Sequence, residues 1–259
     1  MVFQKAAAGG GKMSLNLDEI MESMLEIVRE AGQKSIEMQE NEYSWGDYAD
    51  VDMEIEIFLR ERLGSLIPGS GFLTESFISQ PSEVANWIID SIDGNVNFKN
   101  RLPYSVSVAL EVSGMTEIGI VYELPIGVIY CAQRGKGAYR ISKDRRVQIR
   151  VSSFPEDEGL VLFGFSYDRE KMVPMLQMME KFASFATDLK RIGPASVDIC
   201  KVAEGKAKLY VEQDLKEWDY MAGELILKEA GGAVAHYDDF LIFGVIEATA
   251  EARRIIRGY

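Results

Sequence analysis

The sequence contains very little histidine and cysteine. Its 259 residues include one histidine, His236, and two cysteines, Cys131 and Cys200, which lie far apart and show no CxxC spacing. Zinc sites and histidine-based catalytic triads need such side chains, so both kinds of site are excluded. The cysteines lie in apolar stretches, which indicates reduced core residues. Any metal must therefore be held by oxygen ligands, which suits Mg²⁺, Mn²⁺ or Ca²⁺.

Long apolar runs and an excess of basic charge are also absent. No apolar run approaches the ~20 residues of a membrane helix, and no signal peptide opens the sequence. We therefore expect a cytoplasmic protein with no membrane partner. Acidic residues outnumber basic ones by 41 to 28, for a net charge of −13, so no nucleic-acid polymer is expected as a partner. Hydrophobic residues make up 47% of the chain, enough for a substantial core.

The apolar pattern divides the chain into three parts. Residues 1–12 show no amphipathic period and are predicted to be a flexible leader or tag. Residues 13–154 begin with two amphipathic helices, over 18–34 and 54–66, and continue with strand-like runs at hairpin spacing, which predicts an α+β half. Residues 155–259 alternate strands and helices, which predicts an α/β half.

Two connecting segments have their own interpretation. The polar stretch 39–47 between the two helices predicts an exposed loop. Gly135-Lys136-Gly137 predicts a tight hairpin turn, with a phosphate cradle as the alternative.

Four acidic residues stand where strands end or a helix begins. Asp90 and Asp93 follow the short apolar run 87–89, and Glu75 follows another such run. Asp219 stands at the start of a helix, where an acid is stabilised by the positive helix end and also serves as an ordinary cap. Taken together, in a chain almost without histidine, these acids predict an oxygen-only metal site.

The segments around these acids resemble the signatures of the inositol monophosphatase family. WIIDSIDGNVNF (87–98) resembles its D-P-(I/L)-D-G-(T/S)-x-N-(F/Y) signature, and WDYMAGELILKEAGG (218–232) is similar to its second signature. The segments 73–76, 123–140 and 191–212 resemble further blocks of the family in the same order. The resemblance extends from about Met13 to Gly232. It implies the layered αβαβα sandwich of the inositol monophosphatase and fructose-1,6-bisphosphatase type.

The resemblance also implies which residues form the site. The implied ligands of two or three Mg²⁺ ions, or Mn²⁺ in their place, are Glu75, Asp90, Asp93, Asp219 and the backbone carbonyl of Ile92. The implied substrate contacts are Gly94, Asn95, Gly193, Ala195 and Glu212. Catalytic roles are implied for Glu75, Asp93, Asn95 and Asp52. Asp52 matches an acid near a third, weaker metal, and a helix N-cap is its alternative interpretation.

The implied activity is a Mg²⁺-dependent phosphomonoesterase. Its substrate would be a sugar or polyol phosphate, with inositol 1-phosphate and fructose 1,6-bisphosphate as the main candidates, attacked by a metal-activated water. A nucleotide 3'-phosphatase is the alternative within the same family. The resemblance implies a small phosphate ester as partner and a homodimer as assembly.

Four positions depart from the family pattern. Asn95 replaces the usual Thr or Ser, Ser91 replaces Pro, Ser76 replaces Glu, and Pro194 replaces Ser or Thr. An amide binds water but cannot relay a proton as a hydroxyl does. A second hypothesis is therefore a catalytically impaired homologue that binds metal and phosphosugar.

A third hypothesis uses Asp50-Val51-Asp52 as a D-x-D nucleophile motif for aspartyl-phosphate chemistry. That chemistry needs a hydrophobic strand directly before the first Asp. The preceding segment 41–47 is polar, which disfavours it.

Overall fold

Apolar runs at hairpin spacing in the first half of the chain form one seven-stranded sheet. The computed structural model describes residues 15–40, 48–143, 145–155, 157–166 and 168–258. The strands lie in sequence order, and every neighbouring pair is antiparallel except β1 and β2. They are β1 (Gly71–Thr74), β2 (Asn86–Asp93), β3 (Tyr104–Val112), β4 (Met115–Leu124), β5 (Val128–Gln133), β6 (Ala138–Ser142) and β7 (Arg145–Ile149).

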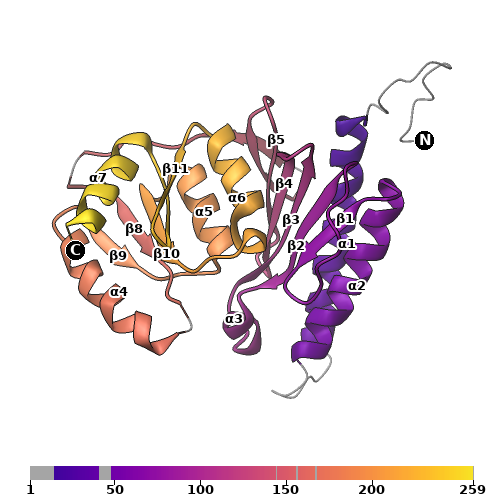
Figure 1. Cartoon of the computed structure of the whole chain (residues 1–259), viewed down its shortest axis with the longest axis horizontal. Helices are drawn as coiled ribbons and strands as arrows, with labels where there is room; N and C mark the ends of the chain where they lie inside the picture. Colours follow the sequence, from indigo (N-terminus) through magenta and orange to yellow (C-terminus); the bar gives the residue numbers. More distant parts are fainter. Residues whose placement is uncertain (1–14, 41–47, 144, 156, 167, 259) are drawn as a thin grey trace.

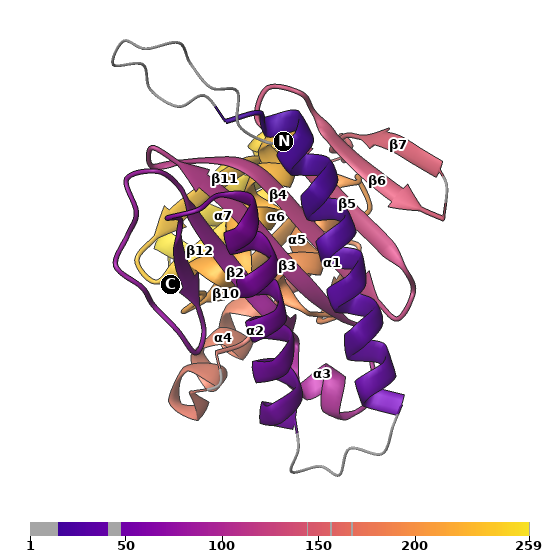
Figure 2. The same cartoon turned by 90° about the vertical axis from the view of Figure 1, so that its right-hand side faces the viewer.

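Two amphipathic helices cover one face of this sheet (Figure 2). α1 (Leu17–Glu40) and α2 (Tyr48–Leu66) bury their apolar stripes against side chains of alternate strand positions, such as Trp87 and Ile89. Both predicted helices are confirmed, and both are longer than predicted. The predicted loop is wrong for residues 39 and 40, which belong to α1, and its remainder lies outside the described residues, as does the 1–12 segment.

The second half of the chain forms a five-stranded mixed sheet in the order β11-β12-β10-β8-β9. Its strands are β8 (Leu160–Phe163), β9 (Asp188–Lys190), β10 (Leu209–Gln213), β11 (Ala233–Tyr237) and β12 (Phe240–Gly244). The remaining helices are α3 (Asn95–Lys99), α4 (Arg169–Phe182), α5 (Ala195–Ala203), α6 (Glu217–Glu229) and α7 (Ile246–Arg257). Figure 1 shows α5 and α6 between the two sheets, with α4 and α7 on the outer face of the second. The αβαβα sandwich is thereby confirmed.

Small residues let the middle helices approach the first sheet closely. A Cβ on Gly119 of β4 would lie 2.6 Å from the carbonyl oxygen of Ala222 in α6, and one on Gly223 would lie 3.1 Å from Ile199 in α5. Real Cβ atoms do not tolerate the first of these distances, so this contact requires glycine. The close packing positions the N-terminal ends of α5 and α6 near the end of β2.

One apolar cluster joins the two halves through this middle layer. It includes Ile88 and Val121 of the first sheet, Ile199 of α5, and Leu162 and Phe243 of the second sheet. The boundary between residues 154 and 155 stays a prediction, because the halves share this core. The two cysteines are buried and free, as predicted. None of the helices in the described part of the chain is long and apolar enough to cross a membrane.

The turn at Gly135–Gly137 joins β5 and β6, which confirms the predicted hairpin. Its two glycine N–H groups bind an internal carboxylate. The N–H groups of Gly135 and Gly137 each donate to one oxygen of Glu229, at 2.8 Å in both cases. The phosphate-cradle alternative is therefore wrong for these groups, which instead hold the C-terminal end of α6 against the first sheet.

Replacing Glu229 with alanine should lower the free energy of unfolding by about 2 kcal/mol, because two charge-assisted hydrogen bonds are lost. Glu224→Ala is the matched control on the same helix, since it removes only an i,i+4 ion pair with Lys228, worth roughly 0.5 kcal/mol. Urea unfolding of the variants gives both values. Equal losses would mean that the turn does not anchor the helix.

Candidate functional site

A β-bulge at the end of β2 turns both of its acidic side chains to the same face of the sheet. Residues three apart in a regular strand face opposite sides. Here Asp90 pairs with Ser107 and Asp93 pairs with Ser105. Asp90 and Asp93 are three residues apart on β2, whereas their partners are only two residues apart on β3. The extra residue brings Asp90 and Asp93 onto one face, the face covered by α5 and α6. Both side chains are buried.

Asp93 binds the N-terminal end of α5. Its Oδ2 accepts a hydrogen bond of 2.9 Å from the backbone N–H of Ser196 and one of 3.5 Å from the Ser105 hydroxyl. The Ser105 and Ser196 hydroxyls lie 2.8 Å apart and also share a hydrogen bond. Pro194, the N-cap residue of α5, makes no side-chain cap. Asp93 of β2 instead accepts from the backbone N–H of Ser196, which has no partner within the first turn of the helix.

Asp219 lies in the first turn of α6. Its Oδ2 accepts a 2.7 Å hydrogen bond from the Lys216 N–H, so the cap interpretation of this residue is correct. Burial, and next the charge of Asp93, raise the pKa of Asp219 to about 7. The capping hydrogen bond from Lys216 lowers this pKa, so the rise comes from burial and from the neighbouring charges and not from the cap.

Asp90 lies at the centre of the negative charge. Its pKa is raised well above the ordinary range, first by burial and then by the charges of Asp93, Asp219, Asp52 and Glu75. The charges of the four other acidic residues proposed from the sequence therefore all act on Asp90. Burial also raises the pKa of Asp93 to about 6, against the lowering effect of its bonds to Ser196. Such repulsion between buried carboxylates favours a bound cation.

Helix α2 contributes two acids to the same region. Asp52 and Glu56 lie one turn apart, and Asp52 accepts a 2.6 Å hydrogen bond from the Ser91 hydroxyl. The N-cap interpretation of Asp52 is wrong, because α2 begins earlier, at Tyr48. The segment 50–52 lies within this helix and not after a strand, so the D-x-D hypothesis is wrong as well.

Glu56 is a residue that the sequence analysis missed. It is buried and accepts a 2.6 Å hydrogen bond from the hydroxyl of Ser76, next to the exposed Glu75. A carboxylate from α2 thus reaches the position where the family pattern has a second Glu. The signal for Glu56 in the sequence was its place directly after Ile55, within the apolar stripe of the predicted helix.

The two loops proposed for substrate binding lie against each other. Gly94 has φ of 97°, and a Cβ added there would lie 3.1 Å from the Cβ of Pro194. Asn95 begins the short helix α3 directly after Gly94. Gly193 and Ala195 flank Pro194 in the second loop. The first loop follows β2 and the second begins α5, so the fold brings these positions together beside Asp93.

Glu212 of β10 reaches the site from the second sheet. Its carboxylate accepts a hydrogen bond from the Tyr210 hydroxyl. Burial raises the pKa of Glu212 to about 7, and the charge of Asp219 also raises it. Any side chain at Gly164 would overlap this carboxylate, since a Cβ there would lie 1.8 Å from Oε2. The glycine is what leaves room for Glu212.

Asp198 was also missed by the sequence analysis. It is 1% exposed, its Oδ2 accepts a 2.9 Å hydrogen bond from the Gly193 N–H, and its Oδ1 has no hydrogen-bond partner among the described residues. Burial raises its pKa to about 7, with Glu212 and Asp93 adding to the rise. Asp198 therefore fixes the loop that precedes α5. Its signal in the sequence was an acid within an apolar helix.

The chemistry of this set suits an oxygen-preferring divalent cation, because several acids repel one another and the donors are all oxygens. Within the described part of the chain, however, no three acidic, histidine or cysteine side chains are yet arranged to hold one ion. The hydrogen bonds that Asp93 accepts from Ser105 and Ser196, and the one that Asp219 accepts from Lys216, all go to Oδ2. Ion binding would require the carboxylates to turn toward a common point.

Comparison with known proteins agrees with this fold. The model of the inositol monophosphatase family matches residues 16–257. The chain is 37% identical over 198 residues to Nus factor SuhB of Haemophilus influenzae, covering 74% of this chain and 73% of that protein. It is 35% identical over 193 residues to inositol-1-monophosphatase of Mycobacterium leprae, covering 71% and 66%. The structure of Mycobacterium tuberculosis SuhB matches with a TM-score of 0.84 at 27% identity, over 93% of this chain and 96% of that one.

The chain belongs to the inositol monophosphatase family. Members of this family are phosphatases that are in general metal-dependent.

Proposed function

We propose that the protein is a Mg²⁺-dependent phosphomonoesterase acting on a sugar or polyol phosphate, with inositol 1-phosphate and fructose 1,6-bisphosphate as the main candidates. The observation that carries the proposal is the shared field of Asp90, Asp93, Asp219, Asp52 and Glu75 at the end of β2. A phosphate ester would be repelled by this field, so substrate binding requires cations that reverse its sign.

The roles proposed for the individual residues are those that the family resemblance implies. Glu75, Asp90, Asp93, Asp219 and the carbonyl of Ile92 would hold two or three ions, with Mn²⁺ as a substitute. Bound Mg²⁺ would supply an activated water and stabilise the leaving oxygen. Gly94 and Asn95 would contact the phosphate, while Gly193, Ala195 and Glu212 would contact the sugar or polyol. Asp52, fixed by Ser91, would help to orient the attacking water.

The substrate proposal is tested by phosphate release at saturating Mg²⁺ from inositol 1-phosphate, fructose 1,6-bisphosphate and adenosine 3',5'-bisphosphate. We expect release from at least one of the first two, and none after EDTA treatment. A clear preference for the third would assign a nucleotide 3'-phosphatase. Background release from all three, with Mg²⁺ still bound, would favour the impaired homologue.

The impaired homologue is the second candidate, and Asn95 is the observation that favours it. Asn95→Thr should raise kcat by about tenfold or more, because a hydroxyl relays a proton that an amide cannot. Asn97→Thr in the same helix α3 is the matched control, with no gain expected. An unchanged kcat in Asn95→Thr would show that water is activated without this hydroxyl. A cytoplasmic homodimer remains the expected form of the protein.

A further inference from the structure

The β6–β7 hairpin concentrates basic side chains in an otherwise acidic chain. Residues 140–150 contain five of the 28 basic residues and one acidic residue, Asp144, which lies outside the described residues. β7 is an edge strand of the seven-stranded sheet, and its first four residues are exposed. Figure 2 shows the hairpin at the far edge of the sheet from β1 and β2.

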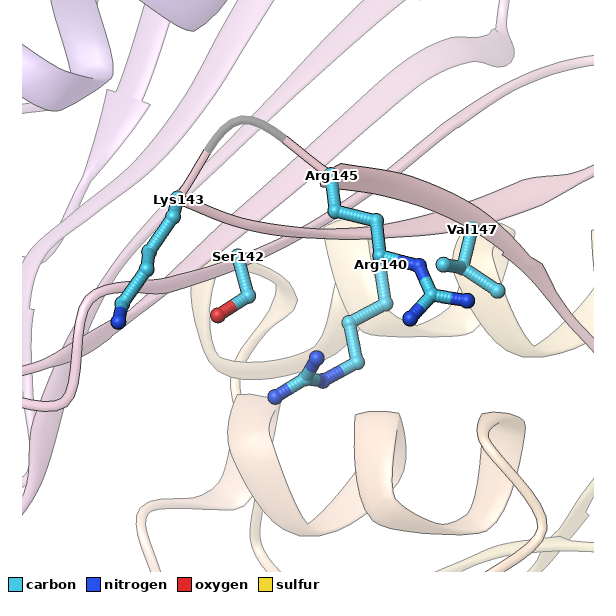
Figure 3. A pocket seen from close by; sticks show the side chains of 5 residues that line it. All are labelled: Arg140, Ser142, Lys143, Arg145 and Val147. Atoms are coloured by element: carbon cyan, nitrogen blue, oxygen red, sulfur yellow. The ribbon is translucent and has the colours of Figure 1, made fainter.

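The strand register places one set of these side chains on a single face. Arg140 pairs with Val147 and Ser142 pairs with Arg145 across the hairpin, so all four lie on the same side. Together with Lys143 in the turn they line a cavity of about 550 Å³. Figure 3 shows Arg140, Ser142, Lys143 and Arg145 extending from the hairpin toward the same side, above the helices of the middle layer.

Among the described residues, the acids near this face do not match its positive charge. Arg140 Nε lies 3.5 Å from Glu204, but Glu204 also pairs with Lys206 at 2.7 Å and accepts the Tyr130 hydroxyl. Arg140 Nε itself has no hydrogen bond among the described residues. The side chains of Lys143 and Arg145 form no ion pair or hydrogen bond with another described residue. The face therefore carries an excess of cations.

Two structural roles account for other cations nearby, and of the three cations in the cavity only Arg145, on the edge strand β7, shares one of these roles. Charges on edge strands block pairing with other chains. Arg146, on the opposite face of β7, is already paired with Glu22 and stacks on the Tyr139 ring at 4.4 Å. Lys206 is held by Glu204 near the C-terminal end of α5, where a cation is favourable. Neither role explains why Arg140, Lys143 and Arg145 share one cavity.

We propose that this hairpin face is a second anion site, where Arg140, Lys143 and Arg145 bind a ligand carrying two or more phosphate groups. Two planar guanidinium groups bind phosphate oxygens in pairs, the lysine adds a third charge, and the Ser142 hydroxyl donates a hydrogen bond. The site is separate from the acids of β2, because four strand spacings of about 4.8 Å, roughly 19 Å, separate β2 from β6.

The test uses the full chain in EDTA, where the acids of β2 carry no cation and repel phosphate. Sodium tripolyphosphate is titrated by calorimetry, and a fluorescein-labelled oligouridylate by anisotropy. We expect sub-millimolar binding that weakens by about tenfold or more in Arg145→Glu, the loss of one charge-assisted phosphate contact. Lys143→Glu should act in the same direction. Arg257→Glu on α7, an exposed arginine with the same charge change, should alter binding less than about twofold.

Each outcome decides the proposal. Variant-sensitive binding of tripolyphosphate supports a site for free oligophosphates. If only the oligouridylate binds, and Arg145→Glu and Lys143→Glu weaken its binding, the site is supported with a phosphodiester chain as its ligand. No binding of either probe, or equal weakening by Arg257→Glu, overturns the proposal. Because metal and substrate are absent, the result is independent of the phosphatase assays.

Discussion

Asp93→Asn is expected to lower Mg²⁺-dependent phosphate release by about 10³-fold or more. A metal ion contributes several kcal/mol of charge stabilisation in phosphoryl transfer, and each 1.4 kcal/mol is about tenfold in rate. Asn keeps an oxygen that can still accept from the Ser196 N–H, so the cap of α5 is retained. The loss should therefore appear in kcat and in Mg²⁺ affinity while the circular dichroism spectrum and the melting temperature are maintained.

Glu83→Gln is the control for removing one negative charge, since Glu83 is exposed in the loop before β2. It should change activity less than about twofold, because an exposed charge is screened by salt. Near-full activity in Asp93→Asn would contradict the assignment of Asp93 as a metal ligand. If Asp93→Asn failed to fold, the main role of Asp93 would be to cap the N-terminal end of α5.

The metal-free protein is expected to become less stable as the pH rises from about 5 to about 8. The pKa is raised to about 6 for Asp93 and about 7 for Asp219, Glu212 and Asp198. Each folded pKa lies above its unfolded value near 4, so the native state holds more protons in this window. Stability is therefore lost as the pH rises through the folded pKa values.

The expected size is a fall of at least about 5 °C in melting temperature in EDTA, since 1 kcal/mol shifts a chain of this length by roughly 2–4 °C. Millimolar Mg²⁺ should reduce the fall, because bound cations compensate the repulsion. Differential scanning fluorimetry across the pH range measures both effects. A melting temperature that rises with pH in EDTA would contradict the raised pKa values.

Asp90→Asn tests whether repulsion among the buried carboxylates, and not the titration of other acidic residues, causes the loss of stability at higher pH. It removes the most repelled charge, so it should raise the melting temperature in EDTA at about pH 8 by a few degrees while abolishing activity. Asp188→Asn is the control, because this exposed acid of β9 is paired with Lys190 and has a lowered pKa. It should give no stabilisation. Destabilisation by Asp90→Asn would mean that its charge is compensated without metal.

Most elements could be predicted from the sequence because apolar periodicity is a local signal. The helices α1 and α2 and the strands from β2 to β5 were predicted in this way. The β6–β7 hairpin and β11 were not, because their exposed and half-buried residues hide the period of two. The three-residue strand β9 is too short to give any pattern.

The site could be predicted only as a set of residues. The place of Asp90 and Asp93 after an apolar run singled them out, and the resemblance implied their role. The bulge that turns them to one face depends on pairing with β3, which sequence spacing does not encode. The same limit applies to Asp198 and Glu56, whose partners Gly193 and Ser76 both lie in loops. Net charge likewise averages over the chain and does not report the basic face of the β6–β7 hairpin.

The middle layer of α5 and α6 has a consequence for how the protein can be divided. A fragment ending near residue 154 would keep the first sheet but leave one broad face of it without cover, including Ile88 and Val121. The complementary piece would retain both helices with their inner apolar surfaces exposed to water. Separately produced pieces should therefore aggregate, and mixing them should favour reassembly into a single particle.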